Sequence, residues 1–329
     1  MNFNKIIASE DDNNRRCDRV LRKFLKQENL SSIYSALRKG LIKVNEKKVK
    51  ADAKIQSGDE ILIADFLMNK KSEESNTTEN ISFTYKLDTV YCDKNIKIID
   101  KAYDIPVQAA RKNEVDIAGI LKQGYTLQEG QKSLSFTPAP LHRLDRRTSG
   151  LLICSQSIAG AQWISLAIKN HLLRKSYIAI LEGKILKDEQ WTDYIDSNKK
   201  IEKSGFKTTF ASKNTDEGKI ALTKIFPVCC GKWNNIDISL CRLDIKTGRT
   251  HQIRAQSALH LHPLLGDFSY GGTKIAPELK SPREHFLHAM SLSFPEKNPL
   301  GIPSEIKSPF PKDFLYFDIF SDFVEKDFF

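Results

Sequence analysis

The chain has 329 residues, and 40% of them are hydrophobic, which is enough for one large folded domain and a smaller one. Its formal net charge of +10 permits binding to nucleic acid or to an anionic surface without deciding between them. No apolar run approaches the roughly 20 residues of a membrane-spanning helix, and the polar residues after Met1 do not predict a secretion signal. The six cysteines form no C-x-x-C pair, which predicts a reduced, cytoplasmic, metal-free protein without a membrane partner.

The positive charge is concentrated near the N-terminus. Residues 15–54 contain thirteen Lys/Arg and only four Asp/Glu. Apolar residues recur at helical spacing around Leu21, with basic residues largely on the other faces, so this stretch predicts a basic amphipathic helix. A second helix is expected after Ser31 and Ser32, which are suitable caps, and Gly40 is expected to end it.

The chain divides into three predicted parts. Residues 14–65 form a compact basic α/β module, in which strands at 41–45 and 60–63 follow the two helices. The polar segment 66–82 predicts a flexible linker, so residues 1–82 are expected to be removable without unfolding the rest. The larger domain, 83–325, has an α+β pattern with a helix at 158–168 and strands at 90–93, 96–101, 151–155, 176–182, 207–213, 220–228, 235–245 and 314–319.

A nine-residue segment, His-Arg-Leu-Asp-Arg-Arg-Thr-Ser-Gly at 142–150, carries the first chemical signal. If the segment is extended, Arg143 and Asp145 share one face while Leu144 points into a core. The Ser-Gly pair at its end is expected to turn the chain before a buried strand. This pattern predicts a carboxylate beside a cation at the rim of a packed sheet.

A second segment strengthens that signal. Residues 247–254 read Thr-Gly-Arg-Thr-His-Gln-Ile-Arg, and residues 263–272 read Pro-Leu-Leu-Gly-Asp-Phe-Ser-Tyr-Gly-Gly. Together with 142–150, Lys-Ser-Tyr-Ile-Ala at 175–179 and Leu-His-Ala at 287–289, they resemble the RluA/RluC/RluD-type pseudouridine synthases over nearly the whole chain. The similarity is greatest to the RluC branch. The N-terminal module resembles the S-four-type RNA-binding module that precedes many of these synthases.

The resemblance implies a mixed, mainly antiparallel central sheet crossed by an active-site cleft. It also implies isomerisation of uridine to pseudouridine, a reaction that requires no cofactor. Asp145 matches the catalytic aspartate, which attacks the ribose, attacks the base or removes a ribose proton; the sequence leaves these three mechanisms open. Arg254 matches the cationic partner that keeps this aspartate ionised. Tyr177 matches a tyrosine that stacks on the uracil and serves in the late deprotonation.

Further residues are expected to contact RNA. Arg143 resembles the arginine that enters the space of the flipped nucleotide. His142 either bonds to RNA or supports its loop, and Arg249 has a phosphate contact or a structural hydrogen bond as its two possible roles. The basic helices are expected to hold RNA phosphates through Arg19, Arg22, Lys23, Arg38 and Lys39.

The predicted substrate is 23S ribosomal RNA, with the protein acting as a monomer. A RluD-like or transfer-RNA uridine isomerase is the alternative within the same chemistry. A non-catalytic ribosome-assembly factor is the alternative from another class, and a glycosidase would need a second carboxylate beside Asp145. Two positions depart from the family pattern. Ala102 stands where a proline usually follows Lys101, and Arg147 replaces a frequent acidic residue, so that an ion pair is lost or RNA affinity is gained.

Overall fold

The computed structural model describes residues 2–68, 85–111, 114–127, 133–203, 206–213, 218–275 and 283–317. The chain divides into two compact units. The first contains Met1–Lys86, Ala118–Ala139 and Ser155–Ala161, and the second contains Leu87–Ile117, Pro140–Cys154 and Gln162–Phe329. Most of the expected linker, 66–82, and the expected domain start at 83 lie outside the described residues. The division into 14–65, 66–82 and 83–325 therefore stays a prediction.

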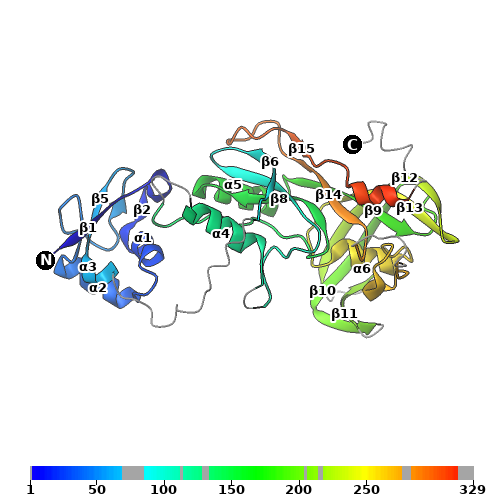
Figure 1. Ribbon diagram of the computed structural model, residues 1–329, viewed down its shortest axis with the longest axis horizontal. Coiled ribbons are helices and arrows are strands. Elements are labelled where there is room, and N and C mark those ends of the chain that lie inside the picture. The colour runs from blue at the N-terminus through cyan, green and yellow to red at the C-terminus, as the bar shows by residue number, and fades with distance from the viewer. Residues whose placement is uncertain are drawn as a thin grey trace. The chain divides into compact units, whose positions relative to one another are not determined.

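The first unit contains a small antiparallel sheet of order β1-β5-β3, a short β2-β4 ladder and helices (Figure 1). The two helices and two strands expected in this region are present, whereas β1 was not anticipated. Its elements are β1 (Phe3–Ile7), β2 (Arg15–Arg16), α1 (Cys17–Phe24), α2 (Leu30–Lys39), β3 (Ile42–Val44), β4 (Lys54–Ile55), β5 (Glu60–Ala64) and α3 (Asp65–Met68).

The ends of α2 follow from local hydrogen bonding. The expected Ser31 and Ser32 caps were wrong, because the side chain of Asn29 accepts the backbone N–H of Ser32 at 2.8 Å and the helix starts at Leu30. Gly40 ends the helix as expected, with φ of 73° in the left-handed region. The apolar faces of both helices pack on the small sheet, and the buried residues include Val20, Leu21, Ile33, Leu37, Ile61 and Ile63.

A buried carboxylate ties the N-terminal residues to residues 133–135 within the first unit. Asp12 is fully buried and accepts the backbone N–H groups of Leu134 and Ser135, at 3.0 and 3.1 Å, and the hydroxyl of Ser133 at 2.9 Å. Arg15 donates to the Ser135 hydroxyl. Burial raises the pKa of Asp12, but hydrogen bonds from Ser135, Leu134 and Ser9 outweigh it and lower the pKa overall. These contacts argue against the expectation that residues 1–82 can be removed harmlessly.

The second unit is built on a ten-stranded sheet of order β11-β10-β12-β13-β9-β14-β8-β7-β6, with β15 paired to β14. The expected mixed, mainly antiparallel sheet is confirmed, and β14 and β8 form a parallel pair. Its strands are β6 (Asp88–Cys92), β7 (Ile96–Lys101), β8 (Ser149–Ser155), β9 (Arg174–Glu182), β10 (Glu189–Lys203), β11 (Phe206–Ser212), β12 (Lys219–Trp233), β13 (Ile236–Ile245), β14 (Leu287–Ser293) and β15 (Glu305–Lys307).

The remaining α-helices are α4 (Ile117–Leu127), which belongs to the first unit apart from Ile117, α5 (Ile158–Lys169), whose first turn belongs to the first unit, and α6 (Gln252–Leu259) of the second unit. Helix α5 matches the helix expected at 158–168. Strands β10 and β14 and helices α4 and α6 were not anticipated. The strand expected at 314–319 was wrong: residues Lys312–Tyr316 form a 3-10 helix, and residues from 318 onward lie outside the described residues. Phe314 is fully buried, with its ring edge-on to Phe286 at 5.4 Å, so packing in the core fixes this turn.

Candidate active site

The loop before β8 presents Asp145 to a pocket of about 540 Å³. Leu144 is buried, while Arg143 is exposed and Asp145 is half-buried, as alternation along an extended segment predicts. The expected turn at the Ser-Gly pair was wrong, because Ser149 and Gly150 already belong to β8. The turn lies earlier, where the N–H of Thr148 donates to the carbonyl of Asp145 at 3.0 Å.

Gly150 has a different structural role from the predicted turn. Its φ is 106°, and a Cβ atom there would lie 2.3 Å from the carbonyl oxygen of Ala289 on the paired strand β14. Only glycine combines this backbone conformation with so close an approach between strands. Gly150 thus fixes the start of β8 and, through it, the end of the Asp145 loop.

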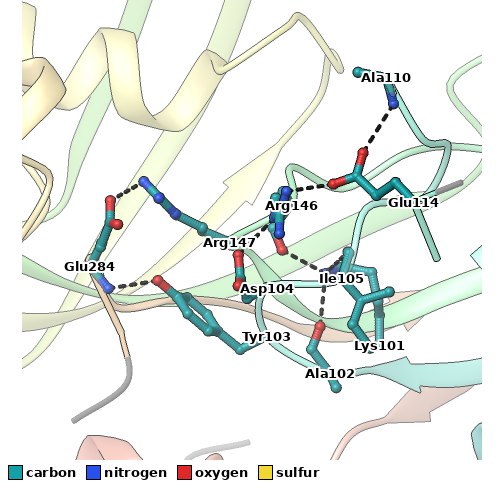
Figure 2. Close-up of polar contacts among 10 residues, drawn as sticks. All are labelled: Lys101, Ala102, Tyr103, Asp104, Ile105, Ala110, Glu114, Arg146, Arg147 and Glu284. Atoms are coloured by element: carbon teal, nitrogen blue, oxygen red, sulfur yellow. Dashed lines mark hydrogen bonds and ion pairs between the residues drawn. The ribbon is translucent and has the colours of Figure 1, made fainter. Parts of the chain in front are cut away.

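Lys101, at the end of β7, holds the same loop from the protein interior. Its side chain is fully buried, and Nζ donates to the carbonyls of Ala102 and Ile105 at 2.9 Å and of Arg146 at 3.0 Å (Figure 2). Burial lowers the pKa of Lys101 to about 7, opposed by the negative charge of Asp145. From the sequence, only the missing proline after Lys101 was noted, and this role of the buried ammonium was not predicted.

Two further arginines fasten the loop at its outer side (Figure 2). Arg146 donates through Nε to Asp104 at 2.8 Å and through Nη1 to Glu114 at 2.6 Å. Arg147, which replaces the family's acidic residue, forms an ion pair with Glu284. An exposed ion pair of this kind contributes little stability by itself. It nevertheless gives Arg147 a partner within the protein, whereas the sequence predicted either a lost ion pair or a gain in RNA affinity.

Tyr177 lies on β9 with its side chain in the same pocket, between Leu243 of β13 and Ala289 of β14. Burial raises its pKa, and the nearby Asp145 charge raises it further. Its hydroxyl therefore stays protonated across the physiological range. Lys175, two residues earlier on the same strand, also lines the pocket, and burial lowers its pKa to about 8.

The Thr-Gly-Arg-Thr-His segment precedes α6 and is held by a network of hydrogen bonds centred on Gln252. Its side-chain oxygen accepts the hydroxyl of Thr247 at 2.8 Å and the backbone N–H of Arg249 at 3.0 Å. The guanidinium of Arg249 lines the pocket and donates to the carbonyl of Ile220 at 3.0 Å. The structural hydrogen bond considered for Arg249 is thus present. His251 precedes the helix in the left-handed region, with φ of 53°.

Arg254 extends from the first turn of α6 into the pocket. The sequence predicted that it pairs with Asp145, but Asp145 is not its direct partner. Its guanidinium binds Asp267 through two hydrogen bonds, of 2.6 Å from Nε and 2.8 Å from Nη2, and also donates to Ser269. Burial lowers the pKa of Arg254, but the hydrogen bonds to Asp267 and its negative charge outweigh this effect, and Asp145 and Tyr270 add to the rise. Asp145 is therefore within electrostatic reach of a guanidinium that another carboxylate holds in place.

His251 is the basic side chain that approaches Asp145 within the described part of the chain. Its Nε2 lies 3.8 Å from Oδ1 of Asp145, and its Nδ1 is 2.9 Å from the hydroxyl of Tyr270. The ring of Tyr270 also lies under Arg254, 4.7 Å from the guanidinium carbon. The contacts of Tyr270 and Asp267 were not predicted from the sequence. Their common position in the Gly-Asp-Phe-Ser-Tyr motif beside α6 was the signal available.

The remaining predicted residues are not all in one place. Arg143 is exposed at the pocket and has no ion-pair partner among the described residues. His142 instead accepts the backbone N–H of Ile153 at 3.1 Å, and burial lowers its pKa, which favours loop support over RNA contact. The five basic residues of α1 and α2 belong to the first unit, where all are exposed and form no ion pair with a described residue: Arg19, Arg22, Lys23, Arg38 and Lys39.

Comparison with known proteins identifies the class of enzyme to which this sheet and pocket belong. The sequence profile of the RNA pseudouridylate synthases matches residues 95–259, so the chain belongs to this family. It is 31% identical to ribosomal large subunit pseudouridine synthase C of Rickettsia conorii, over 90% of this chain and 94% of that protein. It is 29% identical to the protein of that name from Escherichia coli K12, over 88% of each.

A solved structure supports the fold. Human RNA pseudouridylate synthase domain containing 1 superposes with a TM-score of 0.54 at 23% identity, over 69% of this chain and 84% of that chain. Within the described residues, no helix is long and apolar enough to cross a membrane.

Proposed function

We propose that the protein isomerises uridine to pseudouridine in 23S ribosomal RNA, acting as a cytoplasmic monomer. The observation that carries this proposal is the convergence of Asp145, Tyr177 and Arg254 on one pocket in a chain of the RNA pseudouridylate synthase family. The names of its relatives, which refer to the ribosomal large subunit, support the choice of RNA. Uridine and pseudouridine have the same atomic composition, so the overall reaction consumes no second substrate. The roles below are therefore assigned to residues of the pocket.

Asp145 is proposed to be the catalytic carboxylate. The reaction breaks the bond between C1′ of ribose and N1 of uracil, turns the base, forms a bond from C1′ to C5, and moves a proton from C5 to the ring nitrogen left free. A carboxylate beside C1′ can stabilise or capture the electron-deficient sugar carbon while the base turns. Asp145 fits this role because it is only 20% exposed and yet opens into the pocket.

Arg254 is proposed to act on Asp145 through charge rather than through a direct bond. A fixed guanidinium attracts negative charge in its surroundings, and this attraction is stronger in a pocket that excludes water. The two hydrogen bonds that this guanidinium donates to Asp267 hold it in position. Arg254 is thus proposed to supply a constant positive potential throughout the reaction.

Tyr177 is proposed to stack on the flipped uracil and to take part in the loss of the C5 proton. Its ring lines the pocket, and its hydroxyl forms no hydrogen bond with a described residue, so it is available to substrate. Because its raised pKa keeps it protonated, it would act as one member of a proton relay and not as a free phenolate. The exposed cations of α1 and α2 are proposed to hold RNA phosphates.

The proposal is tested by mapping pseudouridine across total RNA from cells with and without the gene, and by incubating the purified protein with unmodified 23S ribosomal RNA. A 23S uridine that is modified only when the gene is present, and that the protein modifies in vitro, is the expected result. Loss of a transfer-RNA site instead would favour the transfer-RNA alternative. An unchanged RNA in both experiments would overturn the proposed activity.

A further inference from the structure

A second hollow, of about 890 Å³, lies where β9 begins and β13 ends, near the Asp145 pocket. Its wall is a continuous polar row across the sheet, because successive strands place paired residues next to one another. The row runs through Gln190 of β10, Lys224 of β12, Asp244 of β13, Ser176 of β9, Ser291 of β14 and Lys307 of β15, each the register partner of the next. We refer to this hollow as the basic groove.

The charge of the basic groove is strongly unbalanced. Its lining contains six Lys/Arg side chains and two carboxylates. Both carboxylates already have partners, since Asp244 lies 3.5 Å from Arg242 and Glu305 lies 3.4 Å from Lys307. Four cations remain without an ion pair to any described residue: Arg174, Lys175, Lys224 and Lys246. Cations gathered in a hollow without counterions repel one another, so the groove favours an anionic occupant.

The basic groove is continuous with the Asp145 pocket. His171, Lys175 and Lys246 line both hollows, so the two hollows meet at this end of the sheet. Because side chains alternate along β9, Ser176 and Tyr177 face opposite sides of the sheet, and a chain molecule bound in both hollows would pass around this end. Lys175 stands at the junction, on the strand that carries Tyr177. A small anion could neutralise one or two of these cations, whereas a polyanion can contact all of them and also reach the Asp145 pocket.

We propose that the basic groove binds the sugar-phosphate backbone of the substrate RNA on one side of the target nucleotide. This inference rests on the proposed function for the identity of the strand. The lining suits backbone contacts: the cations can pair with phosphates, and Ser176, Ser291 and Gln190 offer neutral groups for phosphate or ribose oxygens. Among the described residues that line the groove there is no Phe, Tyr or Trp, so His171 at the junction is the one ring that could stack on a base.

The proposal is tested with the full-length double variant Arg174→Gln/Lys224→Gln. Both residues are exposed and line only the basic groove among the pockets described above. The matched control is Lys187→Gln/Lys297→Gln, which removes the same charge from two exposed positions that line none of them. Binding of unmodified 23S ribosomal RNA is measured across a series of KCl concentrations, and pseudouridine formation is measured separately at saturating RNA.

The groove variant is expected to bind RNA more weakly and to reduce the slope of log affinity against log salt by roughly 0.7 to 0.9 for each lost contact. Its turnover at saturating RNA should equal that of the parent, and the control should match the parent in both measurements. A groove variant with the parent's salt slope would overturn the groove proposal, even while the parent forms pseudouridine. The two proposals can also fail separately. If the groove variant shows the reduced salt slope but the parent forms no pseudouridine, the proposed function is overturned and the groove remains a site for RNA.

Discussion

Lys101→Met removes the buried ammonium that holds the Asp145 loop. Burial lowers the pKa of Lys101 from 10.5 to about 7, which corresponds to about 5 kcal/mol of free energy disfavouring the charged form in the folded protein. Hydrogen bonds to three backbone carbonyls offset part of this cost. In the variant each carbonyl loses its donor, and a buried acceptor left unpaired costs about 1–3 kcal/mol of stability. At pH 7 these two effects oppose one another, so the pH dependence is the sharper test.

The direction of that dependence follows from the lowered pKa. Between about pH 7 and pH 10.5 the unfolded chain keeps a proton on Lys101 that the folded protein releases, so the free energy of unfolding rises with pH. The destabilising effect is complete below pH 7 and is relieved as the pH rises toward 10.5. One proton of difference contributes up to about 1.4 kcal/mol for each pH unit.

The free energy of unfolding of parent and variant is measured by urea denaturation at pH 7, 8 and 9. The difference between the two proteins is expected to shift by about 2–3 kcal/mol across this range, with the parent gaining relative to Lys101→Met. Groups common to both proteins, including Lys175, cancel in the comparison. Parallel pH profiles would refute the assignment of a buried, partly deprotonated Lys101.

Three other substitutions test separate parts of the account. Asp267→Asn should lower the free energy of unfolding by about 3–5 kcal/mol, because it leaves the buried Arg254 guanidinium without its counterion; thermal denaturation measures this, and an unchanged Tm would contradict it. Tyr177→Phe should preserve RNA affinity and slow single turnover by about 100-fold, the usual contribution of a proton-transfer group; parent-like turnover would exclude the hydroxyl from the reaction. Asp12→Ala should lower the free energy of unfolding, measured by urea denaturation, by about 3 kcal/mol, because several buried donors lose their common acceptor. A variant as stable as the parent would support the expectation that residues 1–82 are dispensable.

Local patterns were sufficient to predict much of the fold. Helical spacing around Leu21 and the left-handed preference of Gly40 each reflect interactions within a few residues, and both features are present. Strand β14 and helix α6 were missed because tertiary packing selects them: β14 lies between β9 and β8, and α6 begins only after His251 takes a left-handed conformation supported by distant groups. A strand was expected at 314–319, but packing of the Phe314 ring on Phe286 accompanies a 3-10 helix at Lys312–Tyr316.

The site shows the same division between local and distant determinants. Motif matching identified Asp145, Tyr177, Arg249 and Arg254 as site residues, and all four line one pocket in the structure. No pattern in the sequence gives the distances between them. The partner of Arg254 could not be chosen from the sequence, because Asp145 and Asp267 are both acidic and lie on opposite sides of it along the chain. Lys101 escaped attention because its importance arises from burial beside a loop 45 residues away, which only the folded chain reveals.

The central claim is that Asp145 performs the chemistry of uridine isomerisation. The most direct measurement is single-turnover pseudouridine formation by Asp145→Asn on unmodified 23S ribosomal RNA, with binding of the same RNA determined in parallel. The substitution keeps the size of the side chain and removes its charge, so the account predicts parent-like RNA binding without detectable pseudouridine. Pseudouridine formation at the parent's rate would contradict the assignment of Asp145 and the mechanism built on it.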